Sequence, residues 1–394
     1  MSAARELRGH VKGLNGIRAL AVTLVFVAHK GRLGSMGEAV DAGKLGVWLF
    51  FLISGFLIMG ELHRNRLRIE DAEDAEDAGA RRNAALYVFY MKRALRIFPV
   101  YYLLLAALAI AHHLFYQREV NLGLPWHVLY LSDYWIGFVQ DGWPGTVSHF
   151  WSLAVEQQFY LVAPFVLLFT PASRHVALCA GFVAVAAVVH VALEAGGASP
   201  PLVYACSPWN FALLALGGMG GIACARHRVV AAVAGATPTL LVCTAGLAAV
   251  LVWRVSTRGA PADGALAGGL DVCLAFTLLG VFLWIVNRRN SMLVSVLEWR
   301  PLDYFGTVSY GFYLFHNLIP SKLGEAPYLY ARLQVPAWLQ IGLPVMLQFL
   351  LALLLAHLSW QLLERRLLEF KKPLEAAIRR RLAGRQPAVD LGAR

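Results

Sequence analysis

The sequence predicts an all-α, polytopic membrane protein of about ten transmembrane helices with both termini in the cytoplasm. Its 394 residues are 58% hydrophobic and only 15% charged, whereas soluble proteins carry about 25% charged residues. Ten apolar segments come close to the length of about 20 residues that a helix needs to cross a bilayer core. These segments are residues 14–33, 44–62, 97–115, 150–170, 175–194, 207–225, 229–253, 265–286, 304–320 and 338–362.

The distribution of positive charge predicts the orientation. With the N-terminus placed in the cytoplasm, 27 of the 35 lysines and arginines fall on the cytoplasmic side and 8 on the other side. Cytoplasmic loops of membrane proteins carry such an excess. The net charge of +11 is therefore interpreted as a topology signal. The sequence contains neither zinc-finger spacing nor a patch of basic and aromatic residues, so nucleic-acid binding is not expected.

The five cysteines are scattered, and no Cys-x-x-Cys pair occurs. We interpret them as small buried hydrophobic residues, not as a disulfide framework or a metal site. The first apolar segment lacks a small-residue cleavage site directly after it, so we expect it to be a retained span and not a removed signal peptide.

The chain is expected to form one membrane domain over residues 1–370, followed by a basic cytoplasmic tail over residues 371–394 that is too short for another domain. The main cytoplasmic loop, residues 63–90, contains an acidic run at residues 70–77. Such runs are typical of solvated or disordered surface elements, and we assign this one no catalytic role.

The main external loop, residues 116–148, is rich in tryptophan, tyrosine, proline and glycine. Trp126, Trp135 and Trp143 are expected to belong to an aromatic belt at the membrane interface. A sugar- or lipid-binding mouth is the alternative for these three side chains.

Arg18 and His29 are the two ionisable side chains of the first segment. Eleven residues of helix separate them, which places both on one face, about 16 Å apart along the axis. Because a charge in the middle of a membrane helix costs roughly 2.5–3.5 kcal/mol, such a side chain usually faces a cavity or a partner. The alternative is that Arg18 extends to the headgroups and His29 marks the far interface.

Arg93 and Arg96 open the third segment from the cytoplasmic side. Residues at i and i+3 share a helix face, and two guanidinium groups on one face suit a phosphate. For this segment alone, an anchor that follows the positive-inside rule is the simpler interpretation.

Two further segments carry polar stripes. His149, Ser152, Glu156 and Tyr160 lie on one helix face of the fourth segment. The carboxylate is costly in an apolar helix unless it is paired or functional, so a structural Glu–Arg pair is the alternative to a catalytic role. Ser309, Tyr313 and His316 form another stripe in the ninth segment, where a histidine is more often a packing residue.

These residue types together suit two kinds of chemistry. A histidine that activates a hydroxyl, with a carboxylate that orients or stabilises it, is what acyl transfer requires. Arginines at the cytoplasmic entrance would hold a phosphorylated donor. Proton-coupled transport uses the same residue types, so the residues alone leave both possibilities open.

Five motifs, in order, resemble those of the integral-membrane acyltransferase 3 family of O-acyltransferases, over about residues 10–370. Residues 14–29 are similar to its first-helix signature ending in histidine, and residues 46–58 to its FF-x-x-SGF-LI motif. Residues 89–99 resemble its R-x-x-R-I-x-P motif, residues 151–160 its W-S-L-x-V-E-x-Q-F-Y motif, and residues 309–316 its S-Y-x-x-Y-L-x-H motif.

The sequence departs from the family pattern at three positions. The family often has Asp where Asn15 stands, Asp or a similar residue where Trp48 stands, and a second Glu where Gln157 stands. The last change weakens any mechanism that needs a pair of glutamates. Glu156 keeps the first carboxylate, and His29, Arg18, Arg93 and Arg96 are all intact, so activity is still expected.

The resemblance implies transfer of an acyl group, usually acetyl, from cytoplasmic acyl-CoA (acetyl-CoA in the common case) to a hydroxyl of a surface polysaccharide, a lipid-linked sugar or another glycosylated acceptor. Arg93 and Arg96 would bind the CoA phosphates, and Arg18 would line the donor channel. His29 would act as general base or transient acyl carrier, with Glu156 supporting it. The remaining candidates, as supporting residues, are Ser152, Tyr160, Tyr313 and His316.

No metal cofactor is expected, and the partners implied are acyl-CoA, the acceptor and membrane lipids. The resemblance places the protein in the bacterial cytoplasmic (inner) membrane as a multi-pass protein. No hydrolase-like domain follows the tenth segment, so transfer is expected within the membrane domain or with a separate partner. A transporter or flippase for a lipid-linked sugar or acylated product, and a non-enzymatic scaffold, are the competing interpretations.

Overall fold

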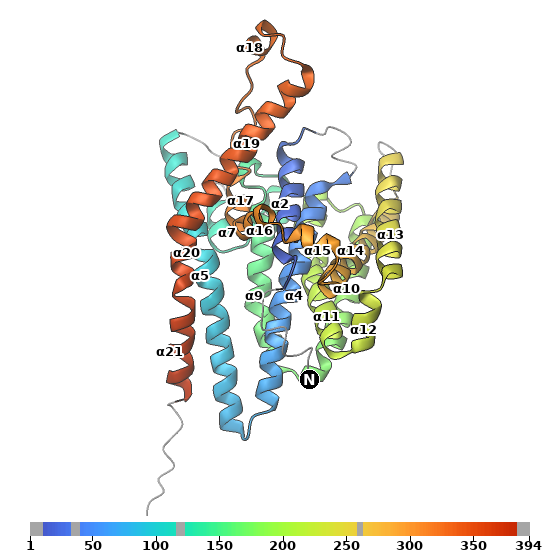
Figure 1. Ribbon diagram of the computed structural model, residues 1–394, viewed down its shortest axis with the longest axis vertical. Helices are drawn as coiled ribbons and strands as arrows, with labels where there is room; N and C mark the ends of the chain where they lie inside the picture. Colours follow the sequence, from blue (N-terminus) through green and yellow to red (C-terminus); the bar gives the residue numbers. More distant parts are fainter. Residues whose placement is uncertain (1–10, 33–39, 116–122, 258–262, 384–394) are drawn as a thin grey trace, which may run out of the picture.

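The computed structural model describes residues 11–32, 40–115, 123–257 and 263–383, whose long helices run side by side in a bundle (Figure 1). These ranges contain helices and turns but no β-strand. Eight helical segments in the described part of the chain are long and apolar enough to cross a bilayer. The expected all-α, polytopic membrane architecture is therefore confirmed.

The long helices are α4 (Ala42–Glu70), α5 (Ala75–Phe115), α9 (Phe150–Phe169), α10 (His175–Ala195), α11 (Pro208–Arg226), α13 (Thr237–Ser256), α14 (Gly264–Asn287) and α19 (Ala337–Ser359). The last of these continues through a π-helical turn, η5 (Trp360–Glu364), into α20 (Arg365–Glu369) and α21 (Lys371–Ala383).

Shorter elements complete the described chain. Before α11 they are α2 (Leu14–Lys30), α7 (Leu124–Val128), α8 (Ser132–Tyr134), η1 (Trp135–Gln140), η2 (Gly145–Val147), η3 (Ala172–Arg174) and η4 (Leu202–Cys206). After α11 they are α12 (Arg228–Ala234), α15 (Met292–Leu297), α16 (Arg300–Thr307), α17 (Ser309–Phe315) and α18 (Pro327–Arg332).

Three expected segments differ from the prediction: one forms a shorter helix, and two divide into two helices. Segment 14–33 is α2, which has 17 residues. Segment 304–320 divides into α16 and α17 at Val308. Segment 229–253 divides into α12 and α13, because Thr237 and Pro238 begin a new helix after Gly235. The number of ten spans and the orientation of the termini stay predictions.

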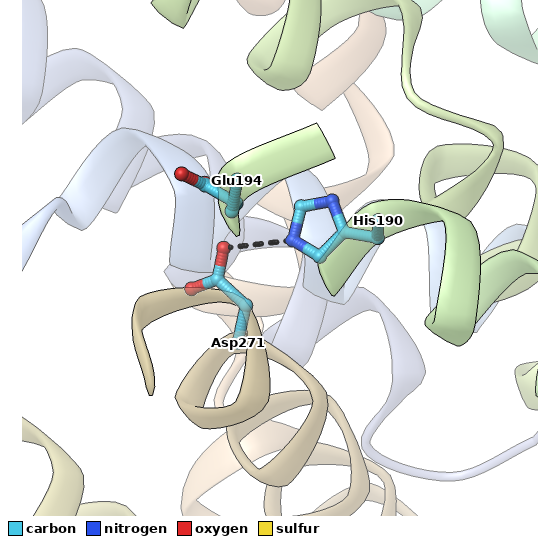
Figure 2. Close-up of side chains that lie close together, drawn as sticks. All are labelled: His190, Glu194 and Asp271. Carbon is cyan, nitrogen blue, oxygen red and sulfur yellow. Dashed lines mark hydrogen bonds and ion pairs between the residues drawn. The ribbon is translucent and has the colours of Figure 1, made fainter. Parts of the chain in front are cut away.

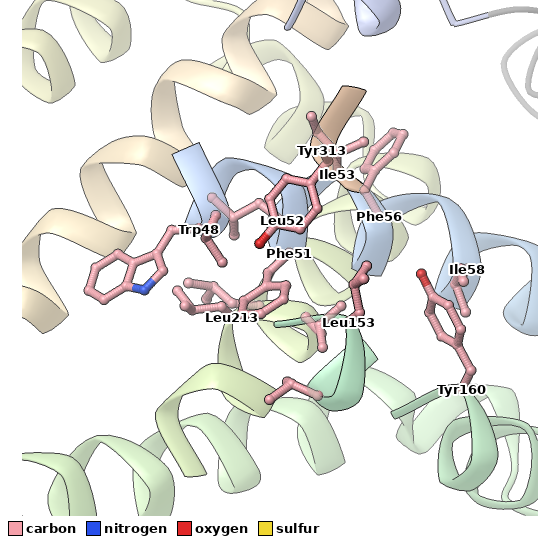
Figure 3. Packing of buried hydrophobic residues seen from close by; sticks show 14 of the residues in the cluster. Trp48, Phe51, Leu52, Ile53, Phe56, Ile58, Leu153, Tyr160, Leu213 and Tyr313 are labelled. Atoms are coloured by element: carbon pink, nitrogen blue, oxygen red, sulfur yellow. The ribbon is translucent and has the colours of Figure 1, made fainter. Parts of the chain in front are cut away.

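Helix α4 lies at the centre of the bundle, where it contacts α2, α5, α9 and α11. Its backbone approaches α11 so closely that a Cβ atom on Gly55 would lie 1.8 Å from the Leu214 carbonyl oxygen. A Cβ on Gly217 would lie 2.1 Å from the Leu52 carbonyl oxygen. Small residues permit this packing between membrane helices. Around the contact, Phe51 and its neighbours form the buried core (Figure 3).

The cytoplasmic loop expected at 63–90 is mostly helical, because α4 extends to Glu70 and α5 begins at Ala75. The two helices form a hairpin with a short turn at its tip (Figure 1). Ion pairs at i, i+4 support it: Arg66 with Glu70 at 2.9 Å and Arg81 with Asp77 at 2.6 Å. The acidic run is therefore a solvated but regular helix–turn–helix, since intrahelical pairing offsets its charge.

The expected external loop folds against the bundle over its described part, residues 123–148. Trp135 is 5% exposed and packs on the ring of His127. The prediction that Trp135 belongs to an interfacial belt is therefore wrong. Trp126 is half-buried, and Trp143 is 44% exposed with its ring against Tyr204. Hydrogen bonds satisfy part of the segment's buried polar groups, including His127 with Ser132 and Asp133 with Gln158, and they support this inward fold.

The cysteines are free thiols, as expected, but they are not all buried. Cys179 is buried, and Cys273 is exposed on the bundle surface. The interpretation as buried hydrophobic residues is therefore wrong for Cys273.

Candidate active site

A cavity of about 840 Å³, including its open mouth, lies where α2, α4, α5, α9 and α17 meet. Its size is typical of a small-molecule or cofactor site. Seven of the nine candidate residues line it: Arg18, Arg93, Arg96, Ser152, Glu156, Tyr160 and Tyr313. Five segments that are distant in sequence thus bring their polar faces to one place. Tyr160 and Tyr313 are seen beside the core packing in Figure 3.

The arginines of the cavity differ in how far their charge is neutralised. Arg93 forms an ion pair with Glu61 at 3.4 Å and lies over the ring of Tyr160. Arg18 and Arg96 have no hydrogen-bond or ion-pair partner among the residues that the structure describes. Two guanidinium groups are therefore available to an anionic ligand, which is the arrangement that favours phosphate.

Glu156 is the carboxylate of the cavity. It hydrogen-bonds to Ser54 and Tyr160, and these two hydroxyls also hydrogen-bond to each other. Of the charged groups around it, Arg18 interacts with it most strongly. In the described part of the chain, Glu156 makes no contact with His29, so it acts on the cavity's cations and hydroxyls.

A line of hydrogen bonds, which passes through the backbone carbonyl of Tyr313, leads from the cavity to His29. The hydroxyl of Tyr313 lies 2.5 Å from Ser152 Oγ. One turn further along, His316 Nδ1 lies 2.7 Å from the Tyr313 carbonyl oxygen and its Nε2 lies 3.3 Å from His29 Nδ1. His29 and His316 are the two candidates outside the cavity lining, and this line connects them to it.

The hydrogen bonds assign the tautomers of both histidines. His29 Nδ1 lies 2.9 Å from the Val25 carbonyl oxygen. Because a carbonyl oxygen only accepts, Nδ1 carries the proton in His29, and the Tyr313 carbonyl fixes the same tautomer in His316. His29 Nε2 is therefore left with a free lone pair on an exposed side chain. A free imidazole lone pair is what a base or nucleophile needs.

Two buried groups hold the outer end of α2, the end predicted to be external. Lys30 donates hydrogen bonds from Nζ to the Ile319 carbonyl oxygen at 2.7 Å and to Ser321 Oγ at 3.0 Å. His149, 2% exposed, packs its ring on His316 with centroids 5.1 Å apart. Both contacts fix the position of the turn that carries His29.

Ser54 and Glu364 belong to the site but were not identified as candidates from the sequence. Ser54 lies within the SGF stretch of the second segment, and that motif was the available signal. Glu364 is 4% exposed in the π-helical turn, accepts a hydrogen bond from Ser359 at 2.9 Å and interacts electrostatically with Arg96. The available sequence signal for Glu364 was an acidic residue only two positions beyond the expected end of the tenth segment.

Comparison with known proteins identifies the family. A family model described as an acyltransferase domain matches residues 11–365. Peptidoglycan O-acetyltransferase OatA of Listeria monocytogenes is 26% identical over 330 residues, covering 79% of this chain and 50% of that protein. Putative peptidoglycan O-acetyltransferase YrhL of Bacillus subtilis is 26% identical over 408 residues, covering 90% and 54%.

A third relative, O-acetyltransferase OatA of Staphylococcus aureus, is 27% identical over 169 residues, covering 41% of this chain and 25% of that protein. The chain thus spans about half the length of the first two relatives. No solved structure matches it. The family match covers nearly the whole chain, and the five motifs fall within it, so the chain belongs to the acyltransferase 3 family of membrane proteins.

Proposed function

We propose that the protein is a membrane O-acyltransferase that transfers an acyl group, usually acetyl, from cytoplasmic acyl-CoA to a hydroxyl of a surface polysaccharide, a lipid-linked sugar or another glycosylated acceptor. Its membrane is the bacterial inner membrane. One observation carries the proposal: a cavity lined by three arginines, two of them without a hydrogen-bond or ion-pair partner among the described residues, is connected by hydrogen bonds through Tyr313 and His316 to an exposed histidine with a free lone pair. The relatives that act on peptidoglycan support a glycan acceptor.

In this proposal the cavity binds the donor. Arg93 and Arg96 hold the CoA phosphates, and Arg18 stabilises the donor farther along the cavity. Charge-assisted bonds of this kind are the strong ones. Glu156 reduces the net positive charge of the cavity and orients the hydroxyls of Ser54 and Tyr160.

His29 carries out the chemistry as general base. The acceptor oxygen bonds to the acyl carbonyl carbon while His29 Nε2 takes the hydroxyl proton. The carbon–sulfur bond then breaks, and the CoA sulfur leaves and receives that proton. Alternatively, His29 carries the acyl group transiently before the acceptor takes it.

Ser152, Tyr313 and His316 support this step. The line from Ser152 to His29 places His316 Nε2 against the protonated Nδ1 of His29 and positions the donor's reacting end beside it. Tyr160 supports Glu156 at the other end of the cavity.

The test is transfer of labelled acetyl from acetyl-CoA in membranes that contain the wild type, His29→Ala or His113→Ala at matched protein levels. His113 is an exposed histidine near the end of α5 and serves as control. Label in glycan or lipid with the wild type and His113→Ala, but not with His29→Ala, is expected. Equal label with His29→Ala would remove His29 from the mechanism, and no label with any of the three would favour the transporter interpretation.

A further inference from the structure

A second cavity, about 610 Å³ including its mouth, lies at the outer ends of α4, α9, α10, α11 and α14. Four aromatic side chains line it: Trp48, Trp151, Tyr204 and Trp209. Trp48 directly follows Val47, and Trp151 directly precedes Ser152. Val47 and Ser152 both line the first cavity. The two cavities therefore lie on different faces of α4 and α9.

The charged groups of this outer cavity are largely neutralised among themselves. Asp271 is 1% exposed and is paired with Lys44 at 3.1 Å, with Arg254, and with His190 at 3.2 Å. Figure 2 shows Asp271 facing His190, with Glu194 beside them. The three have ligand atoms within 4.8 Å of one another, a spacing that a metal ion could use. Because two cations already contact Asp271, a divalent ion would be repelled there.

Two polar groups of the outer cavity lack partners. Trp209 is 1% exposed, and its Nε1 donor has no acceptor in the described ranges. Glu194 lies half-buried at the rim, and its carboxylate has no hydrogen-bond or ion-pair partner in the same ranges. A buried donor without an acceptor is costly, so a ligand oxygen would satisfy Trp209. The carboxylate of Glu194 can accept from a ligand donor at the rim.

We propose that the outer cavity binds a sugar ring of a glycan. A pyranose has apolar C–H faces that pack on aromatic rings, and hydroxyls that both donate and accept hydrogen bonds. This chemistry matches the aromatic walls, the indole N–H and the free carboxylate. An anionic ligand would meet Glu194, and a purely apolar one would leave both polar groups unpaired.

The position of the cavity makes it an acceptor subsite, a role that rests on the proposed function. A Cβ atom placed on Gly43 would lie 3.6 Å from the Tyr204 hydroxyl and 3.2 Å from the Cβ of Ala28. Ala28 directly precedes His29 in α2. A sugar held beside Tyr204 is thus one packed layer from the turn that carries the reactive histidine.

The test is direct binding to the purified full chain in detergent, with chitotetraose, cellotetraose, maltotetraose and mannotetraose as probes. Tryptophan fluorescence and saturation-transfer NMR report binding. At least one probe is expected to bind the wild type, and Glu194→Gln and Trp209→Phe should each bind it about fivefold more weakly. Glu369→Gln, at an exposed position in α20, is the matched control and should bind as the wild type does.

Thermal unfolding of each variant separates lost binding from lost folding, and Glu194→Gln, at the rim, does not disturb the core. The inference is overturned if none of the four probes binds, or if both variants bind as tightly as the wild type. Acetyl transfer to glycan without sugar binding at this cavity would overturn only this inference. Sugar binding sensitive to Glu194→Gln, without acetyl transfer, would overturn the proposed function and leave the binding site.

Discussion

Asp133 carries a pH dependence of stability that can be worked out from its surroundings. Its side chain lies in α8, outside the membrane-spanning helices, and is 1% exposed. Gln158 donates a hydrogen bond to Oδ1 at 2.8 Å, and Oδ2 has no partner in the described part of the protein. Burial raises the pKa of this carboxyl from 3.8 to about 7, because the charged form is poorly solvated there.

The direction of the effect follows from proton binding. Between about pH 4 and pH 7 the folded protein keeps the Asp133 proton while the unfolded chain has lost it. The free energy of unfolding therefore falls as the pH rises through this window and levels off above it. About three pKa units at 1.36 kcal/mol each give a loss of about 4 kcal/mol.

Asp133→Asn removes the ionisable group and keeps an oxygen that accepts from Gln158. Thermal unfolding of the detergent-solubilised protein, followed by tryptophan fluorescence from pH 5 to pH 8, measures the effect. The wild type should lose roughly 5 °C more than Asp133→Asn across this range. Asp141→Asn is the control, since Asp141 is exposed and asparagine tolerates its φ of 45°. The same pH slope in wild type and Asp133→Asn would refute this account of Asp133.

Three further substitutions test the sites. Arg96→Gln should weaken CoA binding about tenfold in calorimetry, since a charge-assisted bond contributes about 1.5–3 kcal/mol, while the exposed Arg300→Gln should not; equal affinities would remove Arg96 from the donor site. Asp271→Asn should destabilise the protein by about 3 kcal/mol in thermal unfolding, because it removes the charge of a buried carboxylate that pairs with the half-buried Lys44 and Arg254; an unchanged midpoint would contradict this. Tyr313→Phe should slow acetyl transfer severalfold and keep CoA affinity, because it removes only the hydroxyl that bonds to Ser152 and to the His149 carbonyl oxygen; unaltered turnover would exclude these bonds from the step.

Helical periodicity predicted which side chains share a face, and this is why much of the candidate site was identified from the sequence. Arg93 and Arg96 both line the cavity, as their i, i+3 spacing implies, and Ser152, Glu156 and Tyr160 reach it from one face of α9. The contrast between apolar segments and charged loops predicted the membrane class for the same reason: burial in lipid imposes a local compositional requirement.

Which faces meet was decided by tertiary packing alone. Glu156 was expected to support His29 but hydrogen-bonds to Ser54, because α4 packs against α9. The inward fold of Trp135 and the outer aromatic cavity likewise depend on contacts between elements distant in sequence. Composition and periodicity determined this protein's membrane class, helices and polar faces, since these depend on neighbours along the chain. The cavities and the path to His29 depend on long-range packing, about which local pattern carries no information.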